Sequence, residues 1–361
     1  MTVNKKELFA DIFPQPTIVG TGLIALDVII NGHNKKEPYF MTGGSCGNVL
    51  IILSYLGWSS FPIGRLREGS FSQFILKDMQ KWGVDISYLN FDDKATTPVI
   101  IEKVRKNGNN GTTHAFSFYC PECNSFLPRY RPITIKQVDS FLQKEIPNSD
   151  ICYIDRVSSG SLKIAEIFKE MGAIIFFEPT KINDDKQFHA ILKISDILKY
   201  SDDIPIADMK IVDQCDVPLK IETRGSSGLA YLLRNDKVQN KKWKTMKAFQ
   251  ILNVIDTAGS GDWCSAGIIH FLKKENISTI NQLDENKLKK GLRFGQALAG
   301  LNCQFYGARG NMYSLSKEKF QQAIVDLLNN GEGNVVSDIS KLKNPQKNKG
   351  YCLICNEKLR V

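Results

Sequence analysis

The sequence has no long uninterrupted apolar run. None of its apolar segments approaches the ~18 residues that a membrane-spanning helix requires. The first residues, MTVNKKELFADIF, contain no extended apolar core of the kind that defines a secretory signal peptide. We therefore expect a protein without membrane spans and with a cytoplasmic location.

The sequence also gives no support for a disulfide framework or for a nucleic-acid-binding patch. Nine cysteines is an odd number with no secretory segment beside it, so a reducing compartment is expected. Lys and Arg (47) outnumber Asp and Glu (38) to give a net charge of +9, but no dense basic block is interleaved with aromatic residues. This distribution does not favour a nucleic-acid partner and is compatible with an anionic small-molecule substrate.

Apolar strands and amphipathic helices alternate from residue 133 onward. The near-continuous apolar character of the strands indicates a parallel sheet covered on both faces. We expect these strands at residues 151–154, 173–177, 197–200, 219–223 and 228–233. Ligands of such sheets bind beyond the carboxyl ends of the strands, and residues 223–228 and 258–262 fall there. The composition, 42% hydrophobic and 24% charged over 361 residues, is ordinary for a globular α/β protein.

The most informative stretch is Ile255–Gly267, which reads IDTAGSGDWCSAG. An alternating apolar run at residues 249–255 predicts a strand before it, and residues 266–272, apolar on one face, predict a helix after it. The small residues Gly259, Ser260 and Gly261 leave backbone N–H groups unshielded at the helix start, where the helix dipole also favours an anion.

A carboxylate at the same helix start, Asp262, would repel a bound phosphate. The two features agree if Asp262 takes the proton of an attacking hydroxyl group while the amides hold the transferring phosphoryl group. The residues thus indicate phosphoryl transfer to an alcohol. The structural alternative is an ordinary helix with an acidic first turn after a glycine turn.

Two other glycine motifs indicate different chemistry and fit less well. Residues 20–25 mimic a dinucleotide fingerprint, but no acidic residue occurs between Glu37 and Glu68, where the ribose contact should fall. Residues 43–47 spell the G-x-S-x-G of a hydrolase nucleophile elbow. Pro38 weakens the strand that this elbow needs before it, and no HGG-type oxyanion loop exists.

The stretch DTAGSGDWCSAG resembles the signature DTxGAGDxFxxG of the ribokinase-like (PfkB) carbohydrate and nucleoside kinases. Two further segments agree with it: GGSCGN at residues 43–48 matches the family pattern GG-x-x-x-N, and TRGSSG at residues 223–228 resembles its T-x-G-x-x-G nucleotide loop. The resemblance covers roughly residues 16–328. It implies a three-layer, Rossmann-like (ribokinase-like) α/β sandwich with a mostly parallel central sheet and a small β-sheet lid.

By this resemblance, residues 1–328 form one kinase domain whose lid comes from about residues 28–42 and 96–120. A lid would exclude water and so prevent wasteful hydrolysis of ATP. Lid strands in such kinases often pair between subunits, so a homodimer through the lid is a further expectation.

The implied activity is transfer of the γ-phosphoryl group of ATP to a hydroxyl of a sugar or nucleoside, with Mg²⁺ as cofactor and K⁺ bound near residues 306–310. The residue roles that follow are Asp262 as general base with Gly259, Ser260 and Gly261 at the phosphoryl group, Asp27, Gly43, Gly44 and Asn48 at the acceptor, and Thr223, Gly225, Gly228 and Ala258 at the nucleotide.

One departure from the family favours an alternative. The usual N-x-x-E motif, which orders magnesium through water, is absent, and residues 200–204 read YSDDI. Asp202 or Asp203 is the expected replacement, because magnesium accepts any well-placed carboxylate. The alternative is a catalytically weak or inactive relative that senses a sugar or nucleotide or binds a partner.

Two C-x-x-C pairs lie outside the family pattern. Cys120 and Cys123 belong to the lid region, and Cys352 and Cys355 lie in a tail that follows a polar linker within residues 329–361. Four thiolates can bind one tetrahedral Zn²⁺, so we predict a structural zinc that attaches the tail to the base of the lid. The alternatives are chance pairs of free thiols and a tail that binds metal together with another chain.

Overall fold

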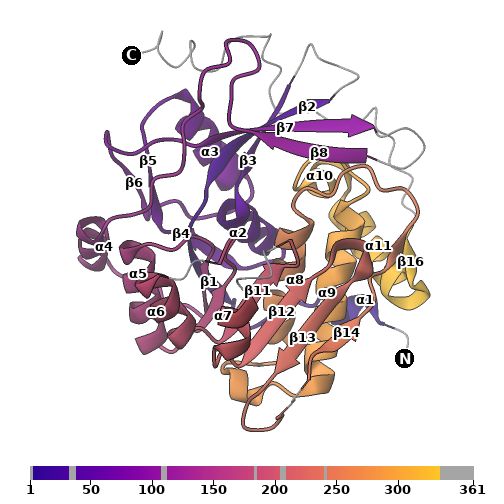
Figure 1. Ribbon diagram of the computed structural model, residues 1–361. Helices are drawn as coiled ribbons and strands as arrows, with labels where there is room; N and C mark the ends of the chain where they lie inside the picture. The colour runs from indigo at the N-terminus through magenta and orange to yellow at the C-terminus, as the bar shows by residue number, and fades with distance from the viewer. Residues whose placement is uncertain are drawn as a thin grey trace.

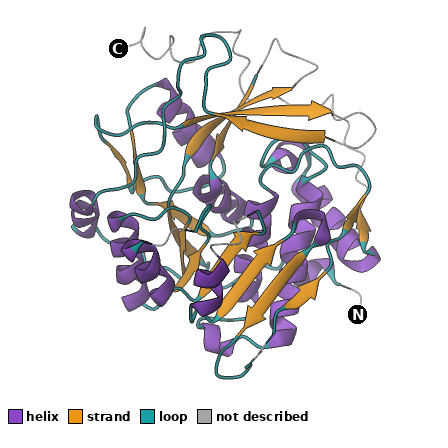
Figure 2. Ribbon diagram, in the orientation of Figure 1, coloured by secondary structure: helices purple, strands orange, loops and turns teal. Residues whose placement is uncertain are grey.

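The computed structural model describes residues 3–31, 38–106, 112–182, 185–203, 209–239 and 242–333. Within them, a large sheet lies between two layers of helices, and a smaller sheet lies above it in the view of Figure 1. Figure 2 separates the helices from the strands in the same view. None of the helices in these ranges is both long enough and apolar enough to cross a membrane.

The large sheet has the strand order β14-β13-β12-β11-β10-β9-β1-β4. The strands are β1 (Thr17–Thr21), β4 (Ser59–Pro62), β9 (Ile151–Ile154), β10 (Ile174–Phe177), β11 (Ile197–Ser201), β12 (Leu219–Thr223), β13 (Leu229–Leu233) and β14 (Lys244–Met246). Neighbours from β4 to β12 pair in parallel, whereas β13 and β14 are antiparallel to their neighbours. The predicted mostly parallel sheet is therefore confirmed.

Each face of this sheet is covered by its own helices, which explains why its strands are apolar at nearly every position. On β9, Ile151 and Tyr153 contribute to one core cluster, and Cys152 and Ile154 to the other. The first cluster includes α2 (Ser45–Tyr55), α3 (Ser70–Lys81), α8 (Ser260–Lys274), α9 (Glu285–Asn302) and α11 (Lys317–Asn330). The second includes α4 (Ile135–Leu142), α5 (Ser159–Glu170), α6 (Lys186–Ile194) and α7 (Met209–Gln214).

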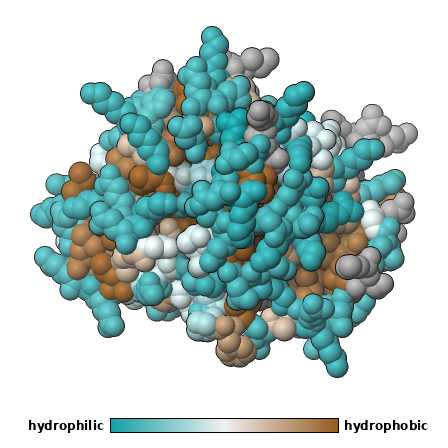
Figure 3. All heavy atoms as spheres, turned by 90° about the horizontal axis from the view of Figure 1, so that it is seen from below, coloured by the Kyte–Doolittle hydropathy of each residue, from teal (hydrophilic) through white to brown (hydrophobic). Residues whose placement is uncertain are grey.

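Helices α8 and α9 pack unusually closely, because glycines face each other where they cross. A Cβ atom at Gly267 would lie 2.6 Å from the Cα atom of Gly295. This contact fixes α8 against α9. The surface seen from below in Figure 3 is largely hydrophilic, with apolar side chains in separate patches, as expected when two helical layers enclose the core.

The small sheet has the order β3-β2-β7-β8. Its strands are β2 (Ala25–Asn31), β3 (Tyr39–Gly43), β7 (Val99–Lys106) and β8 (Thr112–Ser117), and β7 and β8 form the predicted hairpin. Strand β2 pairs in parallel with β7, so that Asp27 lies opposite Ile100. The remaining short elements are α1 (Lys5–Leu8), β5 (Gly64–Leu66), β6 (Leu89–Phe91), η2 (Gly225–Ser227), β15 (Gln250–Ile251), η3 (Ile280–Gln282), α10 (Gly310–Ser314) and β16 (Glu332–Gly333).

The strand predicted at residues 249–255 was wrong in extent and place. Only β15 forms there, and it pairs with β16 outside the large sheet. Phe249 is buried and Ile251 packs against the core, but Leu252 and Val254 are 56% and 39% exposed, so the apolar alternation does not continue to residue 255. The glycine-rich loop therefore begins from a surface segment and not from a central strand.

Candidate active site

A cavity of about 680 Å³ lies between the small sheet and the loop that precedes α8. Six residues with predicted roles line it: Asp27, Gly44, Asn48, Ala258, Gly259 and Asp262. Segments more than two hundred residues apart in the sequence thus meet at one site. Of the other predicted residues, Gly43, Ser260 and Gly261 adjoin lining residues, whereas Thr223, Gly225 and Gly228 lie outside the wall.

Asp262 is half-buried in the first turn of α8, and its side chain reaches the cavity. The Asn48 side chain donates a hydrogen bond from Nδ2 to Oδ2 of Asp262 at 2.8 Å. Burial, reinforced by the negative charge of Glu178, raises the pKa of Asp262 to about 8, although the bond from Asn48 and the charge of Lys199 act in the opposite direction. A carboxylate with a pKa this near neutrality is well matched to general-base work.

The loop before Asp262 needs glycine for its shape. Gly259 has φ +70°, and a Cβ atom there would lie 2.4 Å from the carbonyl oxygen of Ala308. The N–H of Ala258 donates to Asp256 Oδ1 at 3.0 Å, and that of Ser260 donates to Thr257 O at 3.2 Å. Within the described ranges no residue accepts from the N–H groups of Gly259 or Gly261, so these two amides are available to an anion.

A buried ion pair beside the central sheet holds the first turn of α8 in place. Lys199, on β11, forms an ion pair with Glu178 and donates to the carbonyl oxygen of Gly261 at 3.2 Å. Glu178 also accepts a hydrogen bond from Tyr153 at 3.0 Å. Sequence reasoning missed this group, because Lys199 and Glu178 each follow apolar strand residues and neither belongs to a recognised motif.

On the acceptor side, Asp27 lies on β2 against the backbone of Gly43. A Cβ atom at Gly43 would lie 1.8 Å from Asp27 Oδ2, so only glycine permits this approach. Burial raises the pKa of Asp27 to about 7, with the charge of Arg309 acting to lower it. Gly44 has φ +78° at the start of α2, which also carries Asn48.

Sequence reasoning also missed Glu102, on β7 of the small sheet. Its side chain is 1% exposed, lines the cavity and is hydrogen-bonded to Asp256. Burial, followed by the charge of Asp256, raises the pKa of Glu102 well above its ordinary value. Within the described residues its Oε1 atom has no partner. In the alternating sequence of this strand, Glu102 stands where a solvent-facing charged residue is typical. The sequence pattern therefore gave no sign that Glu102 is buried.

The predicted nucleotide residues lie at the carboxyl end of β12. Thr223 donates from Oγ1 to Tyr200 O at 3.2 Å, and Gly228, with φ +101°, passes so close to Met246 that a Cβ atom would lie 2.1 Å from its carbonyl oxygen. Asp202 follows β11 directly and donates from its backbone N–H to Thr223 O at 2.9 Å. The expected replacement for the missing magnesium motif therefore lies beside the predicted nucleotide loop.

The cysteine pairs are described only in part. Cys120 is buried and Cys123 is exposed, whereas Cys352 and Cys355 lie outside the described residues. The described part of the chain contains no group of three or more His, Cys, Asp and Glu side chains that could hold a metal ion.

Known proteins resemble this chain over most of its length. Probable fructokinase-3 of Arabidopsis thaliana is 25% identical over 316 residues, which cover 81% of this chain and 87% of that protein. Fructokinase-2 of Solanum lycopersicum is 25% identical over 315 residues, with 81% and 91% covered.

Solved structures show the same fold. A fructokinase from Vibrio cholerae O395, in its fructose-, ADP- and potassium-bound form, has a TM-score of 0.61 at 16% identity and covers 83% of this chain and 95% of its own. Arabidopsis thaliana ribokinase, in complex with ribose and ATP, has a TM-score of 0.59 at 18% identity, with 86% and 98% covered. The predicted ribokinase-like fold is thereby confirmed.

The family model described as pfkB family carbohydrate kinase matches residues 17–203, which is more than half of the chain. Its match includes the β1–β2 segment and the GGSCGN loop at the acceptor side of the cavity. The chain belongs to the PfkB family of carbohydrate kinases and is a sugar phosphotransferase by class.

Proposed function

We propose that this protein phosphorylates a hydroxyl group of a free ketose sugar with ATP, using Asp262 as the general base. The observation that carries the proposal is the shared cavity, which Asp262 lines together with the polar acceptor-side residues Asp27 and Asn48. Several relatives are fructokinases, so fructose is the first acceptor to test.

The reaction assigned to these residues is a direct transfer. Asp27 and Asn48 would hold hydroxyl groups of the sugar and direct one of them toward Asp262. As that oxygen bonds to the γ-phosphorus, its proton passes to Asp262 and the bond from phosphorus to the β–γ bridging oxygen breaks, which releases ADP. The N–H groups of Gly259 and Gly261 would stabilise the charge on the transferring group.

Cations are needed on the nucleotide side, because ATP carries several negative charges. Arg156 and Lys181 line the same cavity and supply positive charge there. Asp202 and Asp203 are exposed beside Thr223 and would hold Mg²⁺ through water, as magnesium retains several waters in such sites. Bound Mg²⁺ would neutralise the phosphates during transfer. We assign K⁺ to the loop near Gly307, whose N–H donates to Asp256.

An acceptor panel tests the proposal. Purified protein with ATP and Mg²⁺ is incubated separately with fructose, glucose, ribose and adenosine, and the phosphorylated product is identified by mass spectrometry, because ADP release alone also reports hydrolysis. We expect fructose phosphate as the main product. Thermal stabilisation by a sugar without any phosphorylated product would contradict the proposal and favour the non-catalytic alternative.

A structural zinc held by Cys120, Cys123, Cys352 and Cys355 remains part of the proposal. It is supported by the turn at the first pair, where the N–H of Asn124 donates to Cys120 O at 3.0 Å and Asn124 has a positive φ of 53°. Metal analysis should find one zinc per chain in the parent and none after Cys352→Ser with Cys355→Ser. Zinc retained in that double variant would exclude the shared site.

The homodimer through the small sheet stays a prediction. Light scattering of the purified protein would give twice the chain mass if it is correct, and the mass of a single chain if it is not.

A further inference from the structure

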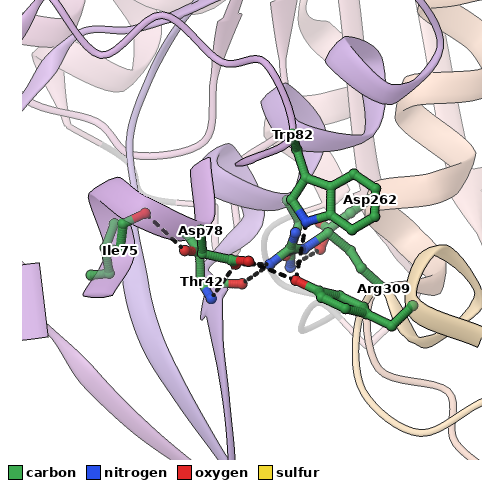
Figure 4. Close-up of polar contacts among 8 residues, drawn as sticks. Thr42, Ile75, Asp78, Trp82, Asp262 and Arg309 are labelled. Atoms are coloured by element: carbon green, nitrogen blue, oxygen red, sulfur yellow. Dashed lines mark hydrogen bonds and ion pairs between the residues drawn. The ribbon is translucent and has the colours of Figure 1, made fainter. Parts of the chain in front are cut away.

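Arg309 is completely buried beside the active site and makes contacts in several directions. It lies immediately before α10, and its Nε donates to Asn48 Oδ1 at 3.1 Å. Its Nη2 donates to the carbonyl oxygen of Thr42 and, at 3.0 Å, to Asp78 Oδ2. Figure 4 shows Arg309 between Asp78 on one side and Asp262 on the other.

The far side of this group is held by α3 and α10. Asp78 accepts from the N–H of Thr42 at 3.0 Å and from the Tyr313 hydroxyl at 2.8 Å, and Trp82 donates to that hydroxyl at 3.2 Å. Burial acts to raise the pKa of Asp78, but the charge of Arg309 and these hydrogen bonds hold it below its ordinary value. Arg309 is therefore fixed by a charged partner that stays ionised.

The chemistry of the guanidinium group decides how the Asn48 amide is turned. Arginine has only donors, so the atom of Asn48 that faces Arg309 must be the carbonyl oxygen. The other end of the same amide, Nδ2, then faces Asp262 and donates to it at 2.8 Å. In the opposite orientation a carbonyl oxygen would face the Asp262 carboxylate and an NH₂ group would face a cation.

We infer that Arg309 is a positioning residue for phosphoryl transfer, which acts by fixing the orientation of Asn48 so that Asp262 always receives a hydrogen bond. This inference rests on the proposed role of Asp262. A hydrogen bond to the charged form of a carboxyl group favours that form. Only the charged form of Asp262 can take the proton of the sugar hydroxyl.

Other charged groups also face Asp262, and none of them is a hydrogen-bond partner of Arg309. They come from the central strands and from the cavity wall: Asp155, Glu178, Lys199, Arg156, Lys181, Asp27 and Glu102. The charge of Arg309 acts to lower the pKa of Asp27, which is read in KM for the sugar, whereas the effects of the other groups on the base should persist in kcat when Arg309 is changed. A shift in the titration of Asp262 after such a change then reports the Asn48 contact.

The test is the pH dependence of kcat in the double variant Arg309→Met with Asp78→Leu. Removing both partners avoids an uncompensated buried charge, a change that folded proteins often tolerate. We expect the acid limb of kcat to move up by about one pH unit, the worth of a hydrogen bond to a charged group. At pH 7 this shift lowers kcat about tenfold, while the plateau at high pH is retained.

Tyr313→Phe is the matched control. It removes a hydrogen bond from Asp78 but leaves the three hydrogen bonds that Arg309 donates to Asn48, Thr42 and Asp78 in place, so the acid limb should stay at its parental pH. Should the double variant fail to fold, Arg309→Lys keeps a positive charge near Asp78, removes the Nε donor and carries the same expected shift.

Two results would overturn the inference. One is a folded variant whose acid limb coincides with that of the parent, and the other is a loss of kcat that is equal at every pH. Failure of the proposed function would look different: either the parent forms no sugar phosphate at any pH, or Asp262→Asn retains full activity regardless of what happens at Arg309.

Discussion

The two sides of the active-site cavity are built differently. On the base side, the first turn of α8 is tied to the central sheet by the buried Lys199–Glu178 pair and the bond to Gly261. On the acceptor side, Asp27 and Glu102 are carboxyl groups whose pKa values are raised by burial, and Glu102 has an oxygen without a partner among the described residues. One side is satisfied within the fold, whereas the other has polar capacity left for a ligand.

This difference has a physical consequence for stability and binding. Groups on the base side should affect folding when they are removed, because their partners become buried and uncompensated. Groups on the acceptor side should affect substrate binding and pH dependence while the fold persists.

The largest effect is expected from Lys199→Met. It leaves Glu178 without its counter-charge in a mostly buried position, where removal of one partner costs roughly 3–5 kcal/mol. Denaturant unfolding should show this loss in the free energy of unfolding. Lys163→Met is the matched control, because its partner Asp139 is 52% exposed and such surface pairs contribute about 1 kcal/mol or less. Equal losses in the two variants would contradict the assignment of the base side as the anchored side.

Asp27→Asn should act on acceptor binding. A hydrogen bond to a charged group is worth about 1.5–3 kcal/mol, so KM for the sugar should rise roughly ten- to a hundredfold while the unfolding free energy changes little. Because the pKa of Asp27 is raised to about 7, the parental KM should fall as the pH rises through 7 and the carboxylate forms. The variant should lack this dependence, and a variant whose KM still falls in that range would argue against Asp27 as the acceptor ligand.

The smallest effect is expected from Glu102→Gln. Burial raises the pKa of Glu102 in the folded chain, so below pH 4.5 the side chain is neutral in both the folded and the unfolded chain. At higher pH only the unfolded chain ionises it freely, which stabilises the unfolded chain. The parent therefore loses stability as the pH rises. The glutamine variant should therefore melt above the parent at pH 8 and close to it at pH 4. Glu166→Gln, on the exposed surface of α5, should show no such difference. A Glu102→Gln advantage that is equal at both pH values would mean that ionisation is not its cause.

The sequence could predict the elements whose signals are local. The central strands β9 to β13, the hairpin and α8 follow from periodicity, and Asp262 follows from its short glycine motif. Asp27 and Asn48 were predicted only from the resemblance to the PfkB kinases. The predicted strand at residues 249–255 was wrong, because only Gln250–Ile251 form a strand and they pair with β16 outside the central sheet, which the local apolar pattern does not reveal.

The contacts that tune the site could not be predicted, because they join distant parts of the chain. Asn48 and Arg309 are 261 positions apart, and Lys199 reaches Gly261 across 62. In the sequence alone, Arg309 and Glu102 look like solvent-exposed charged residues. Both are buried in the fold, which places Asp78 against Arg309 and Asp256 against Glu102.

The central claim is that Asp262 removes the proton of the acceptor hydroxyl. The most direct measurement compares kcat for sugar phosphorylation in Asp262→Asn and in Asp139→Asn, which changes an exposed carboxylate. We expect the first variant to lose roughly a hundred- to ten-thousandfold in kcat with KM for both substrates nearly unchanged, and the second to match the parent. A kcat in Asp262→Asn within a few-fold of the parent would contradict the account.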